Sequence, residues 1–231
     1  CRFACVREAI SEKERCPMKH LALARWIVVV AAILVAYTVL AANSIDVNAS
    51  AAMEGSFGLE AIADGTATNA FVQDDSPANE TIYRASFMFD PNSMTMLTGG
   101  RHIVFSATAD STNGNKAAIT LQVKRKTSGF AIRAMSQVTA GTQREKTGDI
   151  DLTDAPHTVQ LEWQVASGPG VADGYLRLTV DGTTFVERTD VRSYTQSIKN
   201  AKLGHLASSV DPATTGSHYF DDFQSFRTLA P

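Results

Sequence analysis

Two adjacent acids, Asp221 and Asp222, lie in an otherwise apolar segment near the C-terminus, between Phe220 and Phe223. In a strand, successive side chains point to opposite faces, so one of the two carboxylates is expected to face the interior. A buried carboxylate is costly unless it is compensated. Hydrogen bonds from an arginine or from backbone amides would compensate it, and so would a hard cation such as Ca²⁺. The pair predicts a structural polar site, and the sequence leaves both solutions open.

Three aromatic residues bear on sugar binding. Trp163 shares a predicted strand face with Val159 and Leu161, which places it in the core rather than on a sugar-stacking surface. Tyr175 and Tyr194 lie near the ends of predicted loops and are the candidate glycan-binding residues.

Histidines and cysteines predict no site of their own. His102, His157, His205 and His218 lie on four separate segments, so their spacing predicts no zinc site. No cysteine follows Cys16, which excludes a thiol nucleophile and a disulfide scaffold from the rest of the chain.

The segments that must position these residues are strands and turns. Apolar and polar residues alternate over 83–90, 158–165 and 176–180, which is typical of half-buried strands. The dipeptide Asp181-Gly182 between two alternating runs predicts a hairpin, and residues 127–129 predict another. Helical periodicity is nearly absent. The sequence therefore predicts one all-β domain of two packed antiparallel sheets.

The N-terminal part predicts export. We interpret residues 1–17 as an upstream extension that is not native, with Met18 as the start. Residues 18–42 combine a basic start, an uncharged run over 26–42 and a small-residue end, as in a signal peptide or an N-terminal membrane anchor. Residues 43–52 are then a linker and 53–229 the sandwich. The expected location is periplasmic or extracellular, with membrane contact only through 26–42 if that segment is not cleaved.

Composition indicates a globular protein and argues against a nucleic-acid binder. The 231 residues are 44% hydrophobic and 19% charged, which is ordinary globular composition. With 21 Lys and Arg against 24 Asp and Glu, the net charge of −3 argues against nucleic acid as a partner.

The order of these segments resembles a known family. A strand over 157–163 that begins with His and ends with Trp is followed by the loop 166–174, the hairpin 175–187, a strand over 201–206 and the last strand 219–223. This series resembles laminin-G-like domains of the concanavalin A-like lectin and glucanase superfamily, particularly bacterial exported members. Residues 53–59 and 83–90 resemble the first strands, so the resemblance covers about 53–227. It implies a jelly-roll sandwich.

The resemblance also implies two sites. Many members hold a structural Ca²⁺ between their terminal strands, which would make Glu54 the ligand opposite Asp221 and Asp222. Glucanases of the superfamily carry Glu-x-Asp-x-x-Glu, and Asp149, Asp151 and Asp154 have the same spacing. All three acids are Asp here, and Ala155-Pro156 follows, so we expect a solvated loop rather than a catalytic pair.

Three functions follow as expectations. The first is an exported, non-catalytic module that recognises a glycan or cell-envelope polysaccharide, which means that the chain is not an enzyme. The alternative is a glycoside hydrolase or lyase relative that uses Asp149, Asp151 and Asp154. The second alternative is a structural envelope domain with no small ligand. No cofactor other than Ca²⁺ is expected.

Overall fold

The computed structural model describes residues 42–108, 117–138, 144–206 and 214–230. Residues from Ala42 to Pro231 form one compact unit, which is the unit described below. The segment 1–41, which holds all of the predicted export signal except Ala42, lies outside the described residues. No helix among the described residues has the length and apolarity needed to cross a membrane.

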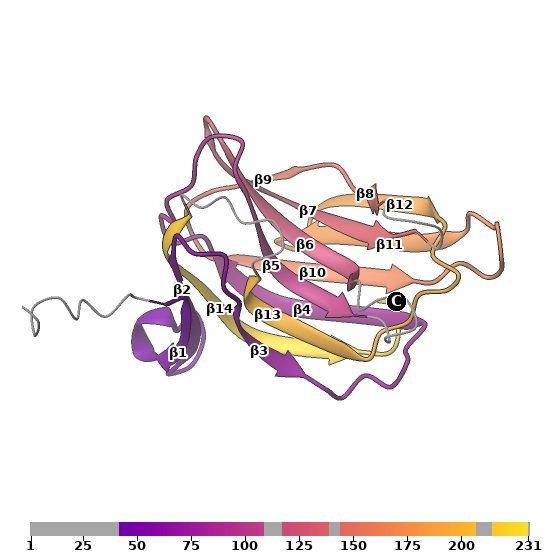
Figure 1. Cartoon of the computed structure of the whole chain (residues 1–231), viewed down its shortest axis with the longest axis horizontal. Coiled ribbons are helices and arrows are strands. Elements are labelled where there is room, and N and C mark those ends of the chain that lie inside the picture. Colours follow the sequence, from indigo (N-terminus) through magenta and orange to yellow (C-terminus); the bar gives the residue numbers. More distant parts are fainter. Residues whose placement is uncertain (1–41, 109–116, 139–143, 207–213, 231) are drawn as a thin grey trace, which may run out of the picture. The chain divides into compact units, whose positions relative to one another are not determined.

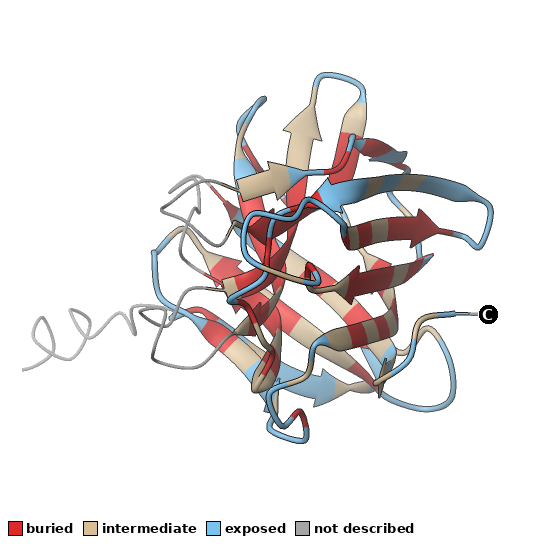
Figure 2. Ribbon diagram, turned by 90° about the vertical axis from the view of Figure 1, so that its right-hand side faces the viewer, coloured by how far each residue is buried: buried red, intermediate tan, exposed pale blue. Residues whose placement is uncertain are grey.

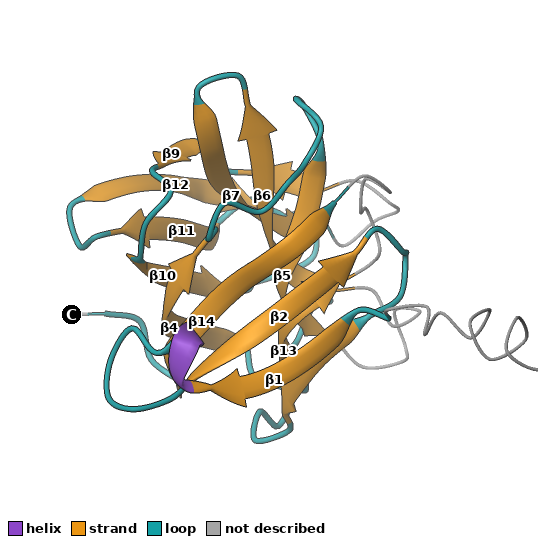
Figure 3. Cartoon of the chain, turned by 90° about the vertical axis from the view of Figure 1, so that its left-hand side faces the viewer, coloured by secondary structure: helices purple, strands orange, loops and turns teal. Residues whose placement is uncertain are grey.

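Two antiparallel sheets of seven strands each make up the unit (Figure 1). The first, sheet A, contains β1 (Ser44–Asn48), β2 (Gly58–Asp64), β14 (Thr215–Phe226), β4 (Ile82–Asp90), β10 (His157–Gln164), β11 (Gly174–Val180) and β12 (Thr184–Val191), in that spatial order. The second, sheet B, contains β3 (Ala70–Asp74), β13 (Asn200–Leu206), β5 (Arg101–Thr108), β6 (Ala117–Lys126), β7 (Gly129–Gln137) and β8 (Arg144–Lys146), while β9 (Ile150–Leu152) also pairs with β7. The one short helix described is η1 (Ala49–Ala51), seen between β1 and β2 in Figure 3. The predicted all-β jelly-roll sandwich is confirmed.

The core lies between the sheets because each strand directs alternate apolar side chains inward. Figure 2 shows buried residues alternating with partly buried ones along the strands. From sheet A the core receives Tyr83, Phe87, Phe89, Leu161, Trp163 and Phe220, and from sheet B it receives Phe105, Ile119, Leu121, Phe130 and Ile132.

Trp163 is fully buried, and its indole N–H donates to the Ser136 hydroxyl across the core at 3.1 Å. The structure therefore places Trp163 in the core, as its strand face predicts.

Two predicted hairpins are present. β11 and β12 are joined through Asp181 and Gly182, whose φ angles of 52° and 68° are left-handed, a conformation that Gly and Asp adopt most readily. β6 and β7 pair up to Lys126 and Gly129 across a two-residue turn.

The N-terminal boundary differs from the prediction. Residues 43–52, expected to be a linker, contain β1 and η1, and β1 pairs with β2 along its whole length. The strand expected over 53–59 begins only at Gly58, where a Cβ would come within 2.0 Å of the Ala51 carbonyl oxygen. Glycine is required for this close approach of two backbones.

Candidate functional site

The outer face of sheet B is polar and basic, and strand register determines which residues lie on it. Leu121 and Val123 of β6 and Ile132 of β7 belong to the core. The residues between them, Gln122 and Arg133, stand opposite each other and point away from sheet A.

We call the cations on this surface the basic face. They come from β5, β6, β7, β8 and β13, and the register of these strands places them on the outward-pointing side of sheet B. The members of the basic face are Arg101, Lys124, Lys126, Arg133, Arg144, Lys146 and Lys202. An open hollow of about 670 Å³ adjoins Lys124 and Lys126 at the end of the β6–β7 hairpin.

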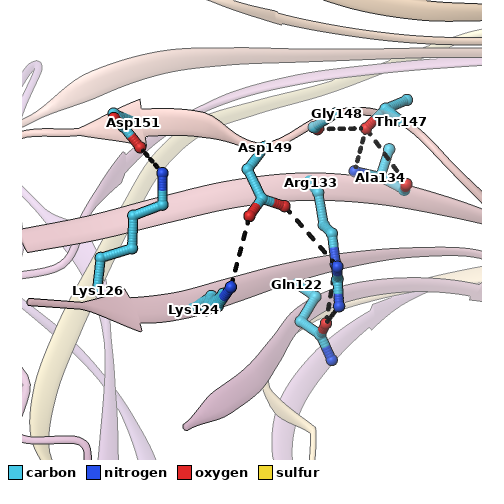
Figure 4. A network of polar contacts seen from close by, with 9 residues as sticks. All are labelled: Gln122, Lys124, Lys126, Arg133, Ala134, Thr147, Gly148, Asp149 and Asp151. Atoms are coloured by element: carbon cyan, nitrogen blue, oxygen red, sulfur yellow. Dashed lines mark hydrogen bonds and ion pairs between the residues drawn. The ribbon is translucent and has the colours of Figure 1, made fainter. Parts of the chain in front are cut away.

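Asp149 lies among these cations (Figure 4). One of its carboxylate oxygens is 3.8 Å from Lys124 Nζ and the other is 3.8 Å from Arg133 Nη1. Arg133 in turn donates from Nε and Nη2 to Gln122 Oε1, at 3.1 and 2.7 Å. Because Gln122 fixes the guanidinium, Arg133 has a defined position although its contact with Asp149 is long.

Burial affects the guanidinium of Arg133, whose side chain is 11% exposed. Burial and the nearby positive charge of Arg101 lower the pKa of Arg133, while Asp149 acts in the opposite direction. A second anion beside Arg133 would therefore be stabilised by a cation that is already partly desolvated.

Thr147 holds the chain that leads to Asp149. Its hydroxyl accepts a hydrogen bond from the Ala134 N–H at 3.0 Å and lies 3.0 Å from the Gly148 carbonyl oxygen (Figure 4). Gly148 follows, and a Cβ at that position would be 3.3 Å from Val186. Asp149 is thus attached to a segment fixed from both sides.

Only two of the three predicted acids reach the basic face. Ile150 and Leu152 of β9 point into the core, so Asp149 and Asp151 share the outer face, where Asp151 accepts a hydrogen bond from Lys126 (Figure 4). Asp154 lies beyond the end of β9, and its carboxylate accepts hydrogen bonds from the Ser93 N–H and hydroxyl. The chain turns at Asp154, as its Ala155-Pro156 sequence predicts, and this separates the third acid from the other two.

Arg144 is a partly buried cation with no anionic partner in the described part of the chain. Its Nη1 donates to the Thr120 hydroxyl at 2.7 Å, and no Asp or Glu among the described residues lies within ion-pair distance of it. Burial lowers the pKa of Arg144. A carboxylate from a ligand would compensate this desolvated charge.

The predicted glycan-binding tyrosines lie elsewhere. Tyr175 is on the outer face of sheet A, with its hydroxyl 3.5 Å from Glu187. Tyr194 is 44% exposed in the turn after β12, where it lines a small hollow with Gln164 and Ser167. Neither tyrosine belongs to the basic face.

The expectation that Asp221 or Asp222 faces the core is wrong. The register of β14 shifts between Asp221 and Gln224, and Asp222 adopts a left-handed φ of 47°. This bulge breaks the alternation, so Asp221 is only partly buried and Asp222 is exposed.

Backbone amides compensate Asp221. Its carboxylate accepts from the N–H groups of Met53, Glu54 and Asp222, at 2.8 to 2.9 Å. Burial acts to raise the pKa of Asp221, but these hydrogen bonds outweigh it and hold the pKa below its usual range. Glu54 thus meets Asp221 through its backbone rather than its carboxylate. Within the described part of the chain, no group of three His, Cys, Asp or Glu side chains is arranged to hold a metal ion.

The basic face was not predicted from the sequence, although a signal for it was present. Lys124 and Lys126 occupy alternate positions of a predicted strand, together with Gln122, and Arg133 does the same in the next strand. Such alternation indicates one polar face. It does not indicate that the two faces meet side by side in one sheet, which depends on the register between strands.

Comparisons with known proteins support the fold. No family model matches the chain. No curated protein matches it. Among solved structures, Cip1, a cellulose-induced protein, matches with a TM-score of 0.55 at 12% identity, over 81% of this chain and 87% of that one. The globular domain of calreticulin from T. cruzi matches with a TM-score of 0.51 at 12% identity, over 81% of this chain and 80% of that one.

An alginate lyase also shares the fold. A variant of alginate lyase Aly36B in complex with an alginate tetrasaccharide matches with a TM-score of 0.50 at 14% identity, over 77% of this chain and 83% of that one. At such identities these likenesses show the fold alone, which is a jelly-roll sandwich of the concanavalin A-like type.

The prediction that the chain is not an enzyme is contradicted by these neighbours. It depended on the habit of non-catalytic modules in the resembled superfamily, whereas an alginate lyase shares the fold of this chain. The chain is a β-sandwich, and its fold gives no ground for excluding catalysis.

Proposed function

We propose that the chain cleaves an acidic polysaccharide and that the basic face binds it. The observation that carries the proposal is Asp149 between Lys124 and Arg133 on a surface of many cations, in a chain whose net charge is −3. Sugar carboxylates are planar anions that Arg binds through paired hydrogen bonds.

The residues around Asp149 suit elimination better than hydrolysis. In elimination from a uronate, a base removes the proton on the carbon that bears the carboxyl group. That electron pair forms a carbon–carbon double bond, and the glycosidic oxygen departs as an alcohol after it receives a proton. A cation against the sugar carboxylate stabilises the negative charge that develops there.

The three groups of the site divide these tasks. Arg133, oriented by Gln122, neutralises the sugar carboxylate, and Asp149 accepts the proton. Lys124, on the other side of Asp149, donates the proton to the departing oxygen. Hydrolysis of a neutral glucan would leave the cations without a role.

Product analysis tests this function. The protein is incubated with polymannuronate, polyguluronate, polygalacturonate and, as a neutral control, a β-glucan. Elimination creates a double bond conjugated with the carboxylate, so we expect ultraviolet absorbance to rise with an acidic polymer and not with the glucan. New reducing ends without ultraviolet absorbance would indicate hydrolysis instead, and no product from any acidic polymer would overturn the proposal.

Asp149→Asn is expected to abolish product formation, because the amide cannot accept the proton. Asp151→Asn is the matched control, since Asp151 lies on the same face but only contacts Lys126. Both side chains are at the surface, so each substitution should change the free energy of unfolding by less than about 0.5 kcal/mol. Equal loss of activity in the two variants would contradict the role given to Asp149.

The setting of this activity is a proposal from the sequence alone. We propose export through residues 18–42 and a laminin-G-like branch of the fold, which would place the protein at the cell envelope. N-terminal sequencing of secreted or periplasmic material should begin near Ala42 to Ser44. Full-length protein in the cytoplasm would contradict export.

A further inference from the structure

Three histidines from different strands meet between the sheets. We call His102 of β5, His205 of β13 and His218 of β14 the histidine trio, and each side chain is fully buried. The ring centroids of His102 and His205 are 4.4 Å apart, and those of His102 and His218 are 4.9 Å apart. Because β14 belongs to sheet A and the other two strands to sheet B, the trio joins the two sheets.

The ring nitrogens of the trio have few hydrogen-bond partners among the described residues. His102 and His218 approach each other through their Nε2 atoms at 3.4 Å, so one ring must carry the proton there and the other must accept it. Within the described residues, no hydrogen bond of normal geometry reaches Nδ1 of His102, Nδ1 of His218 or either ring nitrogen of His205, and all four atoms are buried.

The surroundings of the trio offer little compensation for positive charge. The rings of Phe89 and Phe220 pack against His218. Among the described residues, the acidic side chain whose charge acts on the trio is Asp64 of β2, which influences His205 and accepts hydrogen bonds from Thr66. The backbone at Thr66 and at Gly204 supplies the remaining polar interactions, with His205 and His218 respectively.

Burial therefore keeps the three imidazoles neutral. Desolvation lowers the pKa of His102 and His205 and lowers that of His218 to about 3. Mutual repulsion acts in the same direction, because a proton on one ring would face two neighbouring rings. In the unfolded chain each histidine would take up its proton near pH 6.5.

We propose that the histidine trio is an acid-sensitive latch between the two sheets. While the rings are neutral they pack β14 against β5 and β13. When they take up protons, the buried charges repel, and the strands separate so that the rings reach water. Arg101 and Lys202 of the basic face lie on β5 and β13, the strands that carry His102 and His205. Opening the latch therefore also disturbs the basic face.

The direction of the effect follows from proton binding. The unfolded chain binds more protons than the folded chain below about pH 6.5, so stability is full above this pH and falls as the pH is lowered. For each histidine that binds its proton only on unfolding, the unfolding equilibrium constant rises by up to about tenfold for every unit by which the pH falls. Between about pH 6.5 and about pH 5 few carboxylates titrate, so histidines dominate this window.

Denaturant unfolding of the whole protein, with EDTA present, measures the latch directly. The logarithm of the unfolding constant is plotted against pH over this window, and its slope gives the number of protons taken up. We expect the slope to approach about three protons in the wild type. The double variant His102→Leu with His218→Leu removes both partners of the Nε2 contact together, and its slope should fall to about one.

His157→Gln is the matched control. His157 lies at the start of β10, and its two ring nitrogens contact Asp181 and Thr153 rather than the trio, so its removal should leave the steep slope of the trio in place. If the double variant does not fold, His205→Leu serves instead, and its slope should fall by about one proton.

A second measurement needs no variant. In the folded wild type, ring NMR signals of the trio should not shift with pH until the domain unfolds. The proposal is overturned if these signals titrate near pH 6.5 in the folded state, or if the double variant keeps the slope of the wild type. Because both readouts monitor folding, they are independent of whether the basic face cleaves a glycan.

Discussion

At the scale of single residues, the two sides of sheet B use side chains in opposite ways. On the inner side Ser136 accepts a hydrogen bond from Trp163 of sheet A, which fills the core, whereas on the outer side Arg133 and Gln122 hold a charge at the surface. The core residue is exchangeable only for one of similar volume, while the surface residues are constrained by the geometry of their contacts.

Trp163→Ala should lower the free energy of unfolding by about 3–5 kcal/mol, because it leaves a large cavity between the sheets. Tyr194→Ala is the matched control, since that ring is 44% exposed, and it should change the same quantity by less than about 0.5 kcal/mol. Chemical denaturation measures both. A Trp163→Ala variant with wild-type stability and lost glycan binding would place Trp163 in a binding site instead. Lost activity in Tyr194→Ala would restore the tyrosine as a binding residue.

At the scale of elements, patterns within one strand were predictable from the sequence and contacts between distant strands were not. The alternation over 158–165 and the Asp181-Gly182 hairpin are both present, because each depends on neighbouring residues. The histidine trio depends on β5, β13 and β14 converging from positions up to 116 residues apart, and no spacing rule for metal or catalytic motifs covers such a set. The basic face required the register of five strands.

The bulge in β14 is the element that sequence alternation misjudged. A strict period of two forces one acid of the pair inward, but a single left-handed residue, Asp222, shifts the register and lets both reach the surface. Asp221 then connects β14 to the segment before β2 through the Met53 and Glu54 amides.

Asp221→Ala should lower the free energy of unfolding by about 1–2 kcal/mol, because three backbone N–H groups lose their acceptor. Asp222→Asn is the matched control, since Asn tolerates the left-handed conformation, and it should have little effect. Wild-type melting curves are then recorded with EDTA and with added Ca²⁺. Hydrogen bonding alone predicts identical curves, whereas a melting temperature lowered by EDTA and restored by Ca²⁺ would support the calcium site predicted from Glu54, Asp221 and Asp222.

At the scale of the whole molecule, charge is distributed unevenly. The chain is acidic overall, yet the outer surface of sheet B gathers the cations of the basic face, with Asp149 and Asp151 beside two of its lysines. The basic face attracts a polyanion, whereas the weakly acidic protein as a whole has no general affinity for anions. The electric field of the face extends only over about a Debye length.

This distribution predicts a strong salt dependence of glycan binding. Raising NaCl from about 0.05 M to about 0.5 M shortens the Debye length several-fold, so affinity for an acidic polysaccharide should fall at least about tenfold. The melting temperature should change little over the same range, because the core is apolar and its burial does not depend on ion pairs.

Calorimetric titration measures the affinity for the polysaccharide. Arg144→Gln should reduce this affinity at low salt, because it removes a partly buried cation that has no carboxylate partner among the described residues. Lys199→Gln, which changes a lysine that precedes β13 and does not belong to the basic face, is the charge-matched control. Binding that is insensitive to salt, or equally weakened by both variants, would show that the basic face does not hold the polysaccharide.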